Sequence, residues 1–269
     1  MENDATVARK WSVTAQRFPY ALQGEGIDGV LGISVVSPDY MSFPGVVKWC
    51  SDLGGVPVSP KECFANRLAQ DGANDTDKTQ FTLAIVLYTM VGDEVFARVD
   101  DIAIPEENIA LHFYGDGVAN HGLGDWVLSK SEPLVRSALE RAIADKRSIS
   151  LTDRVKNYTS HSLSLDSTGS SDYGRVLAPF AGSEVSEGNV DFLRGKGYES
   201  GGIWLLTPQD LKSQGLTEEN VVTRLFRVGG VGYFDYSLDD VVAVSGFNGS
   251  GRACAVASSG KKFSTGNEG

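Results

Sequence analysis

Basic side chains are scarce in this sequence, and they are not gathered into clusters. The 269 residues include 24 lysines and arginines against 35 aspartates and glutamates, which gives a formal net charge of −11. The longest basic runs are pairs, at 9–10, 146–147 and 261–262. Nucleic acids and anionic membrane surfaces bind through clustered lysine and arginine. We therefore predict protein partners, with no nucleic acid and no membrane among them.

Long apolar runs are also missing. The longest, over 83–91, is too short for the ~20 residues that a membrane-spanning helix needs. Two of the first four residues are acids, and no apolar core of a signal peptide follows them. The sequence thus predicts neither a signal peptide nor a transmembrane segment, and a location in the cytoplasm or in an assembled particle.

Cysteine is too rare for a disulfide framework. The three cysteines, Cys50, Cys63 and Cys254, are an odd number and show no Cys-x-x-Cys spacing. Free cysteines of this kind are usually buried and behave as small apolar residues. We predict three reduced thiols, most of them in the core.

Glycine, in contrast, is abundant, with 31 residues where a share of about 7% is typical. Many glycines indicate many turns and hence many strands. We predict an α+β fold, a predominantly antiparallel β-sheet with one long amphipathic helix over 132–146 and several short capped helices. The chain is expected to form a single domain over 1–269, with an internal lobe boundary near 166–174 as the alternative.

Several segments carry clear signals for individual elements. The β-branched, nearly uncharged run Gln80–Val91 predicts a central strand, and 95–99 and 109–114 are expected to be further strands. The helix over 132–146 is predicted from apolar residues at helical spacing, with Ser131 as its cap.

Capping residues mark the shorter helices. Ser59 and Glu62 form a capping box around Pro60, which predicts a helix that starts there. Thr207 and Thr217 are expected to cap two short helices separated by a glycine.

Two glycine-rich segments look like nucleotide-binding motifs but lack the context of one. The segment 24–29 matches Gly-x-Gly-x-x-Gly, yet a strand-like sequence follows it where a helix is required. The segment 246–253 resembles a phosphate-binding loop with arginine and alanine at two chemical positions. We interpret both as hairpin turns.

The segment from His112 to Asp125 holds the densest group of side chains that could bind a metal or transfer protons. It holds His112, Asp116, His121 and Asp125 in a glycine-rich stretch after an expected strand. Imidazole and carboxylate groups are ligands of catalytic divalent metals, and His112, Asp116 and His121 could also act as general acids or bases. The alternative is a polar surface loop, because the spacing matches no known metal motif.

Two functions of different class follow. The first is a non-enzymatic assembly or interaction protein, such as a subunit of an oligomer, shell or virus particle, which forms homo-oligomers and needs no cofactor. Aromatic-rich turns such as 233–236 would serve as its contact surface. The second is a metal-dependent or acid–base enzyme of the hydrolase class, with a divalent metal held by the His112–Asp125 segment. Whether the chain is an enzyme stays open at this level.

Overall fold

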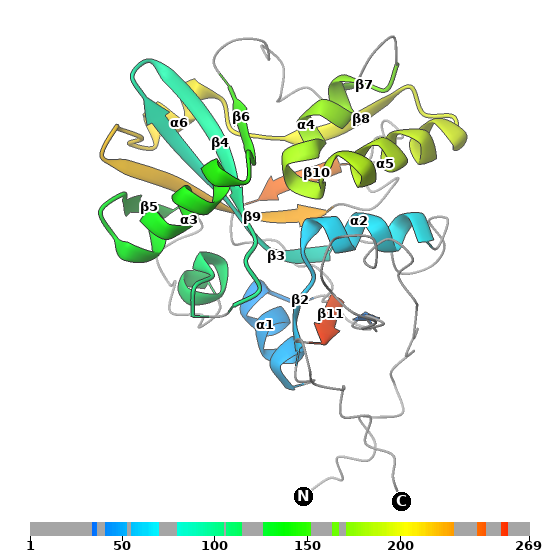
Figure 1. The fold of residues 1–269 in the computed structure, drawn as a ribbon, viewed down its shortest axis with the longest axis horizontal. Helices are drawn as coiled ribbons and strands as arrows, with labels where there is room; N and C mark the ends of the chain where they lie inside the picture. The colour runs from blue at the N-terminus through cyan, green and yellow to red at the C-terminus, as the bar shows by residue number, and fades with distance from the viewer. Residues whose placement is uncertain are drawn as a thin grey trace, which may run out of the picture.

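The structure is a computed structural model of the 269-residue chain (Figure 1). The residues that it describes are 34–36, 41–52, 55–69, 80–104, 106–114, 126–151, 163–166, 171–228, 241–245 and 254–257.

Helices and strands are interleaved along the chain. The helices are α1 (Phe43–Asp52), α2 (Pro60–Ala69), the π-helical turn η4 (Ala110–Tyr114), α3 (Pro133–Ala144), α4 (Asp172–Ala181), α5 (Ser183–Gly195) and α6 (Pro208–Ser213). The strands are β1 (Ser34–Val36), β2 (Gly55–Pro57), β3 (Gln80–Val91), β4 (Glu94–Asp100), β5 (Trp126–Ser129), β6 (Ser148–Ser150), β7 (Leu163–Ser164), β8 (Ser200–Trp204), β9 (Asn220–Val228), β10 (Val241–Ser245) and β11 (Cys254–Ala257).

Most described strands belong to one large sheet built around β3. Its order is β6-β4-β3-β9-β10-β8-β7, and β5 pairs with the part of β9 that β10 leaves open. The neighbours are antiparallel except for β10 and β8, which run parallel. A smaller sheet of order β1-β11-β2 joins segments from both ends of the chain. The predicted α+β class with an antiparallel sheet is confirmed, and Gln80–Val91 is the central strand, as expected.

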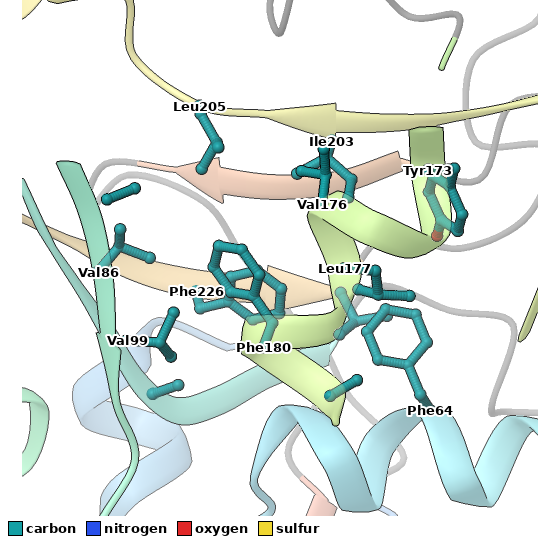
Figure 2. Packing of buried hydrophobic residues seen from close by; sticks show 14 of the residues in the cluster. Phe64, Val86, Val99, Tyr173, Val176, Leu177, Phe180, Ile203, Leu205 and Phe226 are labelled. Atoms are coloured by element: carbon teal, nitrogen blue, oxygen red, sulfur yellow. The ribbon is translucent and has the colours of Figure 1, made fainter. Parts of the chain in front are cut away.

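One face of the large sheet is covered by α2, α4 and α5. In Figure 1 these three helices lie together on the right of the molecule. Figure 2 shows Phe180 of α4 against Phe226 of β9, and their rings stack with centroids 4.6 Å apart. Phe64 of α2 and Val86 of β3 belong to the same buried cluster. Because these side chains are fully buried, this cluster supplies much of the apolar burial that stabilises the fold.

The opposite face is covered by α1, α3 and η4. Phe43 of α1 meets Phe81 of β3 edge to face, with ring centroids 5.6 Å apart. Val135 and Ala138 of α3 pack into the same cluster beside Leu87. The sheet is thus a layer between two cores, and α3 lies where the sequence predicts a helix. The expectation that it is the one long helix is not confirmed, since α5 has thirteen residues and α3 twelve.

The predicted caps are partly right. The Ser59 amide donates to the Glu62 carboxylate at 2.7 Å and the Glu62 amide donates to the Ser59 hydroxyl at 3.2 Å, which completes the box at the start of α2. Thr207 caps α6 through a similar box.

Two other predicted caps are wrong. Thr217 begins no helix, because the Asn220 carboxamide accepts from its amide at 2.8 Å and starts β9 there. Ser131 does not cap α3, which begins at Pro133 after Glu132 without a side-chain cap.

The strand expected over 109–114 is also wrong, because this segment forms the π-helical turn η4. The buried Asn108 carboxamide donates to the carbonyls of Leu83 and Ile102 and accepts from the Leu111 amide at 2.9 Å. These bonds fix the chain in a helical turn against β3, since a buried carboxamide has to satisfy its donors and acceptor. The apolar run over 109–114 is as long as a typical strand, so its periodicity alone does not distinguish a strand from a helical turn.

Helices α4 and α5 have no counterpart among the predicted elements. Pro179 lies inside α4 and Gly188 inside α5, and both residues weaken a helical signal. The Ser171 hydroxyl, which accepts from the Gly174 amide, caps α4. A serine cap followed by apolar residues at helical spacing would have been the signal for this helix.

Several predictions fall outside the described residues. These are the two glycine-rich segments 24–29 and 246–253, the aromatic turn 233–236 and residues 167–170 of the proposed lobe boundary. Cys50 and Cys63 are buried and carry no disulfide, as expected. Among the described residues, no helix combines the length and apolar composition that crossing a membrane requires.

Candidate interaction surface

The predicted metal or acid–base segment begins at η4. His112 lies on this turn with its side chain exposed, and its amide donates to the Asn108 carbonyl at 3.0 Å. Asp116, His121 and Asp125 lie outside the described residues. Within the described part of the chain, no group of three histidine, cysteine, aspartate or glutamate side chains could hold a metal ion. A site formed by these four residues stays a prediction.

Two arginines bind the carboxylates at the end of β4 and directly after it. Arg141 of α3 forms a two-pronged contact with Asp100, with Nε and Nη2 each 3.0 Å from a carboxylate oxygen. The same guanidinium reaches the Glu107 carboxylate at 3.3 Å. Burial raises the pKa of Asp100, and the hydrogen bonds from Arg141 oppose that rise. Its pairing with Arg141 favours the charged carboxylate, so this aspartate ties α3 to β4.

A second arginine joins three further segments. Arg147 forms a two-pronged contact with Asp101, and its Nε donates to the Pro179 carbonyl at 2.9 Å. Its Nη2 also donates to the Phe180 carbonyl at 3.1 Å. One guanidinium therefore holds the end of α4 beside the loop after β4, and its charge stabilises the fold there.

Glu62 is a half-buried acid, and its carboxylate completes the capping box of α2. Burial raises the pKa of Glu62, whereas the hydrogen bonds from Ser59 lower it. Asp100 and Asp101 hold separate elements together, whereas Glu62 fixes the start of its own helix. Asp100 and Asp101 of the acidic stretch near β4 therefore serve packing.

A different part of the molecule offers a surface for a partner. We use "hairpin end" for the end of the large sheet formed by the β3–β4 turn (91–94), β5 with Lys130, and residues 218–220. The Gly92 amide donates to the Glu218 carboxylate at 3.1 Å, and Lys130 Nζ donates to the Met90 carbonyl at 2.9 Å. These bonds between distant segments make the hairpin end one connected surface.

Strand β5 forms an edge at the hairpin end. It pairs with β9 along one side, and no other described strand pairs with it. Its four residues carry no charge, and 48% of the Val127 side chain is exposed. Natural edge strands are usually protected by charge, proline or a bulge, because their open amides and carbonyls can pair with another strand.

A polar corner lies on the face of the sheet that α3 partly covers. Register places Thr89, Phe96 and Ser150 in one row across β3, β4 and β6, so their side chains share a face. The Arg98 guanidinium lies over the Phe96 ring, 5.1 Å from its centroid. We name Thr89, Phe96, Arg98 and Ser150 the "Arg98 corner".

The Arg98 corner contains unsatisfied buried atoms. Thr89 Oγ1, Arg98 Nε and Ser150 Oγ have no hydrogen-bond partner, and Thr89 is only 1% exposed. Burial lowers the pKa of Arg98. Burial and the charge of Arg98 also lower the pKa of Lys130, whereas the carboxylates of Glu218 and Glu219 raise it. Burial thus acts on two cations, Arg98 of the corner and Lys130 of the hairpin end, and the charge of Arg98 also acts on Lys130.

Comparison with known proteins adds one finding on the fold. No protein-family model and no curated protein matches the chain. A solved structure reported as "Accommodation of massive sequence variation in Nanoarchaeota by the C-type lectin fold" does match, with 13% identity and a TM-score of 0.52. The match covers 86% of this chain and 100% of the other. The chain is similar to that protein in fold. At 13% identity, this similarity concerns the C-type lectin fold alone and does not establish a shared function.

The residues of the hairpin end and the Arg98 corner were missed by sequence reasoning. Strand β4 alternates Glu94, Phe96, Arg98 and Asp100 on one face with apolar residues on the other. This alternation would have placed Arg98 on a half-covered face, in contact with other strands. Its proximity to Lys130 depends on tertiary structure and has no sequence signal.

Proposed function

We propose that the protein is a non-enzymatic subunit of an assembly, located in the cytoplasm or in a particle, which associates with a second copy through β5. The observation that supports this proposal is the uncharged edge of β5 with the half-exposed Val127. Pairing of two such edges satisfies open backbone groups and buries apolar surface at the same time. Because two antiparallel copies of one strand are related by a two-fold axis, the natural product is a symmetric dimer.

The fold supports a binding role as well. The C-type lectin-fold protein to which the chain is similar is described as accommodating massive sequence variation. A framework that accepts many surface sequences suits recognition of partners, since recognition changes with the surface while the core is kept. In this chain, two apolar clusters and the arginine contacts of Asp100 and Asp101 stabilise such a framework.

Sizing by light scattering tests the proposal. The wild-type protein should be an oligomer at micromolar concentration, and Val127→Lys should weaken its association at least tenfold by placing a charge in the interface. Ile143→Lys is the matched control, because Ile143 is 54% exposed on α3, away from β5. A wild-type protein that is monomeric at every concentration would reject the proposal.

The metal-dependent or acid–base enzyme stays as a second candidate. It is favoured by the exposure of His112 on a π-helical turn, since such turns are frequent at functional sites. Calorimetric titration with zinc or manganese should then show stoichiometric binding that His121→Ala abolishes. The control His161→Ala, which replaces the histidine outside the His112–Asp125 segment, should preserve this binding. Absence of binding in the wild-type protein would dismiss the metal site.

A further inference from the structure

We propose that Arg98 and Lys130 form a binding site for a carboxylate group carried by an acidic peptide segment of a protein partner. The site lies on the face of the sheet beside α3, whereas the proposed self-association uses the backbone edge of β5. The two interactions are therefore separable, and this proposal does not require the second copy.

The first support is the contrast between Arg98 and the two arginines that bind aspartates. Arg141 and Arg147 each donate hydrogen bonds from two guanidinium nitrogens to an aspartate, and both contacts link different elements of the fold. Arg98 has no hydrogen-bond partner at Nε and no carboxylate acting on its charge, and it contacts the Phe96 ring instead. A half-buried guanidinium costs free energy unless it is paired. Retention of an unpaired one is expected where the partner is a ligand.

The second support is the position of Lys130 on the other side of β3. Strand β3 separates β4, which carries Arg98, from β9 and β5, which leads to Lys130. The Lys130 ammonium donates to the Met90 carbonyl and keeps further donors. Glu218 and Glu219 both act on the charge of Lys130, and the Glu218 carboxylate also accepts a hydrogen bond from the Gly92 amide. The two cations therefore flank the row that contains Thr89, whose buried hydroxyl also lacks a partner.

The surroundings favour a carboxylate on a peptide over a phosphate. A planar guanidinium matches a carboxylate with two hydrogen bonds, and a single ammonium adds one more. The corner also presents apolar surface, because Val91 shares this face with Thr89 and is 56% exposed. A chain of net charge −11 repels a dianion more than a single carboxylate. An acidic residue next to an apolar residue is the segment that fits.

Nuclear magnetic resonance of the full-length protein can test the site directly. The probe is the peptide N-acetyl-Glu-Leu-amide, added at constant ionic strength, with N-acetyl-Gln-Leu-amide as the neutral isostere and inorganic phosphate as the competing anion. We expect saturable shifts of the Arg98 Nε–H signal and of the Val91 and Phe96 amides with the acidic peptide alone. No shift at Arg98, equal shifts with the neutral peptide, or a stronger response to phosphate would each overturn the proposal.

Variants separate binding from structure. Arg98→Met and Lys130→Met should each abolish the peptide-induced shifts or weaken binding at least fivefold. Arg175→Met, which removes an arginine paired with Asp172 on α4, should leave binding unchanged. Because Arg98 is unpaired, Arg98→Met should melt at the same temperature as the wild type or higher. A lower melting temperature together with unchanged peptide binding would show that Arg98 is structural, against the proposal.

The self-association proposal is distinguished by one further variant. Val127→Lys should disrupt the oligomer and leave the Arg98 shifts intact, whereas Arg98→Met should leave the oligomer intact. Peptide binding that disappears in Val127→Lys would mean that the site depends on the assembled form, which contradicts the separate site proposed.

Discussion

At the scale of single residues, an ion pair between a cation and an aspartate contributes a different amount to stability when it is buried than when it is exposed. Arg141 and Lys48 both pair with an aspartate, yet the side chain of Asp100 is 4% exposed and that of Asp52 63%. Removal of the cation from a buried pair leaves an unpaired charge in the core. In an exposed pair, water solvates the carboxylate that remains. The structure thus allows a matched comparison within one chain.

We predict that Arg141→Met lowers the free energy of unfolding by about 3 kcal/mol, because the Asp100 carboxylate stays buried without its partner. Lys48→Met should lower it by only about 0.5 kcal/mol, the usual size of an exposed i,i+4 pair. Urea unfolding of the three proteins measures both values. Equal losses in the two variants would refute the structural role assigned to Arg141.

Glu62 predicts a dependence of stability on pH. Its pKa in the folded protein is raised above the ordinary value of 4.5 by burial, so the folded state holds this proton more tightly than the unfolded chain. The stability that Glu62 contributes is therefore fully present below pH 4.5 and is lost as the pH rises through the folded pKa. Nearby Asp101 adds to the rise in pKa, and Lys61 opposes it.

Glu62→Gln isolates this effect, since glutamine also completes a capping box but carries no charge. The variant should gain stability relative to the wild type as the pH rises from 4 to 8. Urea unfolding at several pH values gives the difference, and Glu187→Gln on the exposed side of α5 corrects for the loss of one negative charge. A difference that shrinks with rising pH would contradict the raised pKa.

At the scale of elements, close packing decides which glycines can be replaced. A Cβ atom at Gly201 of β8 would lie 2.6 Å from two ring carbons of Tyr173, which is fully buried and bonded to Asn189. A Cβ atom at Gly188 of α5 would lie 2.9 Å from Leu68 Cδ1, the end of a flexible side chain. The first contact cannot relax without moving α4, but the second can.

Gly201→Ala should therefore lower the free energy of unfolding by about 2 kcal/mol, as overpacked cores do. Gly188→Ala should stay within about 1 kcal/mol of the wild type, because alanine favours the helix and Leu68 can shift. Thermal or urea unfolding separates the two. If both variants unfolded alike, the close approach of β8 to α4 would be wrong.

The elements also show what the sequence can and cannot predict. Strand β3 and helix α3 could be predicted because their patterns are long and regular. The turn at η4 could not, since the side chain of Asn108 decides it through a bond to Leu83, which lies 25 residues away. The Arg98 corner likewise depends on pairing among β3, β4 and β6, and no local pattern encodes that pairing.

At the scale of the whole molecule, net charge opposes the proposed assembly. Two copies with a formal charge of −11 each repel at long range, while the β5 edge that would join them is uncharged. Salt screens this repulsion over a distance of roughly 8 Å at 0.15 M. Association should strengthen as sodium chloride rises from low to physiological concentration, which sedimentation velocity can follow. An association that weakens with salt would point to an interface of opposite charges.

The central claim is that β5 is the edge through which copies of this protein meet. Amide hydrogen exchange, followed by mass spectrometry at low and high protein concentration, tests it most directly. The account predicts that amides of Trp126–Ser129 become more protected as concentration rises, while those of α5, a helix that covers one face of the sheet, stay unchanged. Exchange of β5 that is independent of concentration, in a protein shown by sizing to be oligomeric, would contradict the account.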